Sequence, residues 1–228
     1  MQMFRRIIFV AGLAGLIAGV LLTALQMSRA IPLILEAEVY EATAASGQES
    51  EGAPAAPAAQ EALAPSDGFE RTFSTLVFNI VMSVGYALLL AAGFALTGQS
   101  GWRKGLYWGA AGFVSFVLAP GIGLPAEVPG ALAAPLLDRQ LWWLGTVMAT
   151  GGGLALMFLV RTWQWVAVGA ILIVLPHVIG APQSAEQGGL TPESLARQFV
   201  IAVLVSSFLF WLALGTLSGF FYKRFAAA

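Results

Sequence analysis

The sequence predicts an all-α, polytopic helical membrane protein with six transmembrane helices and both termini in the cytoplasm. Six apolar runs divide the 228 residues, and each is near the length that spans a hydrocarbon core of about 30 Å. Hydrophobic residues make up 58% of the chain and charged residues 10%, against roughly a quarter charged in soluble domains. This composition excludes a soluble domain, and we expect one membrane domain over residues 1–228.

The charges are segregated between the two sides of the expected membrane. All 12 acidic residues fall in the first, third and fifth gaps between apolar runs. The termini and the other two gaps contain Arg5, Arg6, Arg103, Lys104, Arg161, Lys223 and Arg224. Basic residues near span ends stay in the cytoplasm, so the acidic loops are predicted to face outward. Adding or removing one span would place the basic ends on opposite sides.

The expected spans cover residues of about 6–28, 73–96, 103–122, 140–160, 163–181 and 198–221. The first follows two arginines, as a signal peptide would. It is too long for the apolar region of a signal peptide, which has roughly 7–15 residues, so we interpret it as a retained span. Between the first two spans, residues 42–65 are rich in Ala, Pro, Gly, Ser and Glu. Such a segment buries little apolar surface, and we expect a disordered outer linker.

Three spans contain glycine pairs at GxxxG spacing, a pattern that lets two helix backbones approach closely. The pairs are Gly15 with Gly19, Gly105 with Gly109, and Gly215 with Gly219. A run of three glycines, 151–153, lies in the fourth span and has two interpretations. One is helix packing, and the other is a broken helix that lines a pathway.

Prolines and aromatic residues gather at the expected outer ends of the last four spans. The prolines at 125, 129 and 135 and the nearby glycines predict a stiff, non-helical loop over 124–130. Tryptophans at span ends are typical of the aromatic belt. We assign to this outer mouth Pro125, Glu127, Pro129, Arg139, Trp142, Trp143, Pro176 and Pro182. Arg139 has three options: it pairs with Asp138, extends to lipid headgroups, or binds one of the glutamates.

Residues able to bind a metal ion are few. The chain has no cysteine, so thiolate sites and disulfides are excluded, and it has one histidine, His177. His177 either hydrogen-bonds a neighbouring helix or acts as a metal ligand or proton relay. Glu36, Glu38 and Glu41 either form a solvated acidic flank or gather cations near a pore mouth.

Other kinds of chemistry have no support in the sequence. Charged residues are missing near the middle of every span, which argues against a carboxylate-driven pump. Polar residues inside spans are able to hydrogen-bond between helices: Asn79, Ser83, Thr146, Thr150, Ser206 and Ser207. We find no nucleophile–base pair, phosphate loop or dinucleotide fingerprint, so enzyme activity is not expected. No basic patch is dense enough for nucleic acid.

Several blocks of the sequence, taken in order and spacing, resemble the CbtA family of predicted cobalt transporter subunits. The blocks are 3–6, 23–26, 32–41, 120–125, 139–143, 175–182 and 210–215. The resemblance covers nearly the whole chain except the linker at 42–65. The resemblance implies about five spans, whereas the charge pattern of this chain favours six.

The resemblance implies a bacterial inner-membrane protein that takes up cobalt for cobalamin biosynthesis, with its acidic loops in the periplasm. It also implies a small one-span partner, CbtB, with a histidine-rich metal motif. We therefore expect a cobalt permease subunit in which His177, Glu36, Glu38 and Glu41 supply outer ligands. Cobalt would be the substrate, and no permanently bound cofactor is expected. The alternatives are a non-transporting scaffold subunit of a larger complex, or the substrate-binding component of an ATPase-driven vitamin or metal importer.

Overall fold

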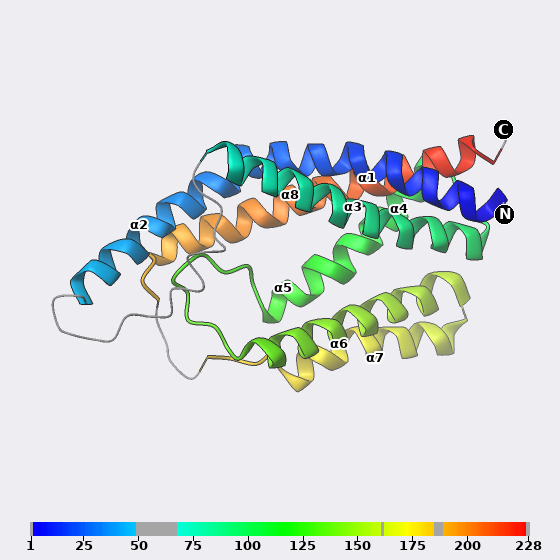
Figure 1. Cartoon of the computed structure of the whole chain (residues 1–228). Helices are drawn as coiled ribbons and strands as arrows, with labels where there is room; N and C mark the ends of the chain where they lie inside the picture. The colour runs from blue at the N-terminus through cyan, green and yellow to red at the C-terminus, as the bar shows by residue number, and fades with distance from the viewer. Residues whose placement is uncertain (1, 49–67, 161, 185–188, 227–228) are drawn as a thin grey trace.

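The computed structural model describes residues 2–48, 68–160, 162–184 and 189–226 (Figure 1). Helices account for most of this part of the chain. They are α1 (Gln2–Ser28), α2 (Ala30–Gln48), α3 (Phe69–Thr97), α4 (Trp102–Phe113), η3 (Val114–Leu118), α5 (Ala119–Gly123), α6 (Leu136–Ala155), η4 (Leu156–Val160), α7 (Trp163–Ile179) and α8 (Glu193–Arg224). The two segments named η are π-helical and continue the helices before them.

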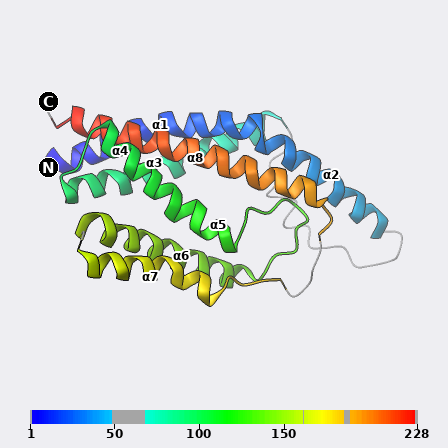
Figure 2. The same ribbon diagram turned by 180° about the vertical axis from the view of Figure 1, so that it is seen from behind.

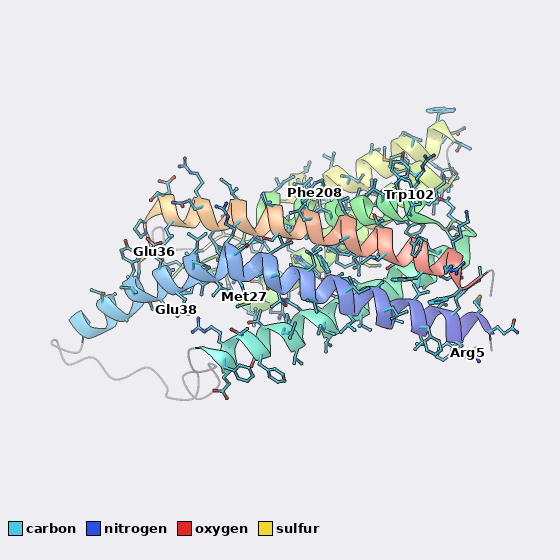
Figure 3. The ribbon with its side chains drawn as sticks, turned by 90° about the horizontal axis from the view of Figure 1, so that it is seen from above. Arg5, Met27, Glu36, Glu38, Trp102 and Phe208 are labelled. Carbon is cyan, nitrogen blue, oxygen red and sulfur yellow. The ribbon has the colours of Figure 1, made fainter. Side chains whose placement is uncertain are left out.

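Six helical passes run in alternating directions, so the two chain ends lie at the same end of the molecule (Figure 1). The passes are α1, α3, the continuous run α4–η3–α5, α6 with η4, α7 and α8. Seen from above, Arg5 and Trp102 lie at the end that holds the termini, and Glu36 and Glu38 lie at the opposite end (Figure 3). The labelled basic and acidic residues are therefore separated along the helix axes, as the charge pattern predicts.

Five helices of the described chain are long and apolar enough to cross a membrane. They span Gln2–Ser28, Phe69–Thr97, Trp102–Gly123, Leu136–Val160 and Glu193–Arg224. The sixth apolar helix, α7, has 17 residues, or about 26 Å at 1.5 Å per residue, which is at the short limit for a crossing. It ends two residues earlier than the sequence indicates, because Gly180 adopts a φ of 89° and Pro182 follows.

The helix α2 continues further than the composition suggests. It reaches Gln48, so residues 42–48 of the expected linker are helical, and the rest of that linker lies outside the described residues. Alanine is the strongest helix former, and no proline interrupts the chain between Pro32 and Pro54. A break separates α1 from α2 at Arg29, because Pro32 has no N–H to donate to the carbonyl of Ser28.

Four helices, α1, α3, α4 and α8, form a bundle, and α6 and α7 form a separate pair (Figures 1 and 2). In the bundle, α1 packs on α3 and α8, and α4 packs on α8. Its core includes Val10, Phe94, Trp211 and Leu214. The α6–α7 pair contacts the bundle mainly through η3 and α5.

The six glycines at GxxxG spacing lie where bundle helices cross. A Cβ atom at Gly15 would lie 2.6 Å from the Cα of Val84, and one at Gly19 would lie 2.7 Å from the Cα of Ile80, both on α3. The other two pairs face each other across the α4–α8 crossing. There, a Cβ at Gly219 would lie 2.8 Å from the Cα of Gly105. Backbone approach of this kind excludes any side chain at these positions.

The glycines at 151–153 do not break α6, which continues through them into η4. Gly153 instead lies against α7, where a Cβ would be 2.6 Å from the carbonyl oxygen of Gly169. This third close crossing holds α6 and α7 together. Of the two interpretations of these glycines, the structure supports helix packing at Gly153.

Candidate outer-face site

Three sequence blocks far apart in the chain meet at the end opposite the termini. They are the end of α5, the first turns of α6 and the last turns of α7. The indole Nε1 of Trp142 donates a hydrogen bond of 3.3 Å to the carbonyl oxygen of Pro176. The rings of Trp142 and His177 meet edge to face with centroids 6.0 Å apart. Gly123 of α5 completes the contact, since a Cβ there would lie 2.9 Å from Cζ2 of Trp142.

This arrangement follows from local features of each helix. His177 comes directly after Pro176, within one turn of the end of α7, and its side chain is partly buried. Trp142 is in the second turn of α6, so its indole reaches across to α7. His177 is thus a partly buried imidazole next to an aromatic ring, near the end of α7.

The loop between α5 and α6 is anchored at two points. Arg139 Nη2 donates to Glu127 Oε2 at 2.6 Å, so of the three options for Arg139 the structure selects a glutamate. Thr191 Oγ1 donates to the carbonyl oxygen of Pro129 at 3.0 Å, which joins the loop to the segment before α8. Pro125 is exposed and Val128 is buried. Prolines and these contacts make the loop a defined surface beside the site.

The three glutamates lie on α2, which packs on α1 and α8. Glu38 accepts a bidentate hydrogen bond from Arg71 of α3, at 2.9 Å from Nη1 and 3.3 Å from Nη2 (its α2 position is visible in Figure 3). Glu36 and Glu41 are exposed. The ion pair of Glu38 with Arg71 therefore holds α2 against α3.

The structure does not bring His177 and the three glutamates into one metal site. Within the described ranges, no group of three or more histidine, aspartate or glutamate side chains is placed to hold an ion. The sequence placed all four residues on the outer side, but only packing decides lateral position. His177 belongs to the α6–α7 pair, whereas the glutamates extend from the bundle. The structure therefore places the four expected ligands on two elements, His177 on α7 and the glutamates on α2.

A polar contact inside the bundle joins α1 and α3. Asn79 Nδ2 of α3 donates to Thr23 Oγ1 at 3.0 Å and to Gln26 Oε1 at 2.6 Å, both on α1. Ser83 donates to the carbonyl oxygen of Asn79. From the sequence, Asn79 is recognisable because its polar amide lies inside an apolar run, where it needs a hydrogen-bond partner. Its partners depend on the pairing of α1 with α3, which no local pattern indicates.

One comparison with known proteins identifies a family. The family model for CbtA, described as probable cobalt transporter subunit, matches residues 4–223. No curated protein and no solved structure matches the chain. The matched range includes every helix described above apart from the outermost residues of α1 and α8. The chain therefore belongs to the CbtA family of probable cobalt transporter subunits.

Proposed function

We propose that this chain is the membrane permease subunit of a cobalt uptake system that supplies cobalamin biosynthesis. The family match over residues 4–223 is the observation that carries this proposal. The alternating helical passes and the acidic outer end support it, because they describe a multi-pass protein with a cation-attracting face. We place the chain in a bacterial inner membrane, with the acidic end in the periplasm and both termini in the cytoplasm.

We propose that the uptake system includes a second subunit, small, one-span and histidine-rich, like CbtB. The chain itself has one histidine and no cysteine. His177 is near the outer end of α7 and away from the glutamates, so additional nitrogen ligands would have to come from a partner. Cobalt is the cargo in this proposal, no resident cofactor is required, and the chain is not an enzyme.

The proposal is tested by measuring cobalt accumulation in cells that express the chain with and without its small partner. Nickel and zinc serve as competing ions. Accumulation selective for cobalt supports the permease. If the inserted protein accumulates no cobalt, two other functions take its place: stable association with a larger complex would indicate a scaffold, and co-purifying ATPase subunits would indicate a component of an ATPase-driven importer.

His177 has a separate test. We expect His177→Ala to abolish cobalt uptake, since it removes the one imidazole that the chain offers to the ion. Gln140→Ala is the matched control, because Gln140 is a polar residue on the first turns of α6 at the same end of the molecule. Unchanged uptake by a normally expressed His177→Ala protein would remove this residue from the mechanism.

A further inference from the structure

The bundle and the α6–α7 pair are two bodies joined along a narrow zone, which is visible in Figure 1 where α5 approaches α6. Each body is closed internally by glycine crossings, α4 with α8 in the bundle and Gly153 with Gly169 in the pair. Between the bodies, contacts come mainly from η3 and α5 on one side and α6 on the other. We call this zone the seam and define it by Ser115, Phe116, Trp143, Thr150 and Gly151.

The contacts establish which face of α6 lies in the seam. The rings of Trp143 and Phe116 have centroids 6.1 Å apart. A Cβ at Gly151 would lie 3.7 Å from Oγ of Ser115. Thr150 is seven residues after Trp143, so it lies on the same face of the helix two turns further along. Thr150 therefore lies on the face of α6 that carries Trp143, next to Gly151, which lies against Ser115.

The hydroxyl of Thr150 is buried without a hydrogen bond. Its side chain is 0% exposed, and Oγ1 has no hydrogen-bond partner among the described residues. Other buried or half-buried hydroxyls in these helices donate to the carbonyl four residues earlier, as Thr23, Ser83 and Thr146 do. A polar group at this depth is normally paired, and an unpaired one requires an explanation, which can be a water or an ion that binds there.

The backbone opposite Thr150 also departs from regular α-helix. In η3 the amide of Ala119 bonds the carbonyl of Val114, an i−5 register. Pro120 has no N–H, so the carbonyl of Phe116, four residues earlier, lacks the donor that it would have in a regular α-helix. Single-turn π-helical segments occur frequently at functional sites. Irregular backbone at membrane depth is tolerated where it is buried in protein or lines a polar path.

We propose that the divalent cation crosses the membrane along the seam, with the hydroxyls of Thr150 and Ser115 bonding its hydration shell. This inference rests on the proposed function and adds the route of the ion. The contact of Trp142 with His177 lies at the outer end of the same helix pair. Trp142 directly precedes Trp143 of the seam, so this contact adjoins the proposed route. The waters bound to a cation donate hydrogen bonds outward, and the oxygen atoms of neutral hydroxyl groups can accept them, so a route of this kind needs no carboxylate inside the spans.

The test uses the absence of native cysteine, so each introduced thiol is unique. Thr150→Cys and Ser115→Cys are compared with Ser218→Cys. Ser218 is the matched control: it is 0% exposed and its hydroxyl also lacks a partner among the described residues, but it lies inside the bundle on α8. A positively charged methanethiosulfonate reagent modifies thiols that reach water as thiolates, whereas thiols in apolar surroundings are inert.

We expect the thiols at 150 and 115 to react about ten-fold or more faster than the thiol at 218, and cobalt to slow both reactions. In uptake assays, Thr150→Val should lower cobalt accumulation by up to about ten-fold, the upper end of the effect of one lost hydrogen bond. Thr150→Ser and Ser218→Ala should retain accumulation. Membrane insertion of each variant is checked by its amount in the membrane fraction, and its folding by elution as a single species in detergent.

The two proposals fail in different ways. Normal cobalt uptake together with equally slow labelling at 150 and 218 overturns the route and leaves the permease. Fast labelling at 150 in a protein that never accumulates cobalt overturns the proposed permease function. It also overturns the proposal that cobalt is the ion that moves along the seam. Unchanged uptake by Thr150→Val overturns the part assigned to its hydroxyl.

Discussion

Two alanine substitutions three residues apart on α1 test the close packing of the bundle. At Gly15 an added Cβ would lie 2.6 Å from the Cα and Cγ2 of Val84, whereas ordinary contact begins at 3.4 Å. Because the obstacle includes backbone, α1 and α3 would have to separate by about 0.8 Å, the difference between these two distances. At Gly12 nothing lies within 4 Å, so Gly12→Ala meets no obstacle.

The magnitude follows from comparing the two variants. Both gain the same helix propensity, about 1 kcal/mol for glycine to alanine, so this contribution cancels. Only Gly15→Ala has the cost of overpacking, typically about 1–3 kcal/mol. We therefore expect its free energy of unfolding to be about 1–3 kcal/mol lower than that of Gly12→Ala.

The assay is unfolding by sodium dodecyl sulfate in mixed micelles, followed by tryptophan fluorescence. Trp108 and Trp211 report on the bundle, because both pack in or against its core. A difference between the variants below about 0.5 kcal/mol, the usual range for surface changes, would refute the close contact of α1 and α3.

Three further predictions concern the bundle, the topology and the outer face. Asn79→Ala removes two interhelical hydrogen bonds and should lower the free energy of unfolding by about 1–2 kcal/mol in the same assay; an unchanged value would contradict the pairing. For topology, an impermeant thiol reagent added to intact cells should modify Leu132→Cys and spare Gln2→Cys, and the reverse pattern would contradict inside termini. The double change of Glu36 and Glu41 to glutamine should raise the cobalt concentration for half-maximal uptake at low ionic strength and have less effect in high salt, as screening requires; a salt-independent effect would exclude electrostatic attraction.

The outer face illustrates how far sequence patterns reach. The prolines at 125 and 129 and the tryptophans at 142 and 143 indicate a stiff loop and an aromatic helix start from local residue types alone. The same patterns leave three options for the partner of Arg139. The structure selects Glu127, and it adds the bond from Thr191 to Pro129, a contact across 62 positions in the chain that no local pattern indicates.

The candidate metal residues show the same division. Charge and hydropathy placed His177 and the three glutamates on one side of the membrane, because both patterns act along the membrane normal. Neither pattern contains information about direction within the membrane plane. Packing placed α2 on the bundle and α7 in the separate pair, and the four residues are consequently apart.

The sequence by itself determined the helical class, the approximate bounds of the apolar helices, the separation of the acidic from the basic ends and the glycines that lie at helix crossings. These features are local, since span length, residue propensity and the cost of burying charge act on each segment separately. Only the tertiary structure decided which helices pair, that α2 continues to Gln48, and that Gly151 lies against Ser115 across the seam. These depend on the fit of one helix surface to another, and many pairings are compatible with the same hydropathy until close contacts such as Gly15 with Val84 select one.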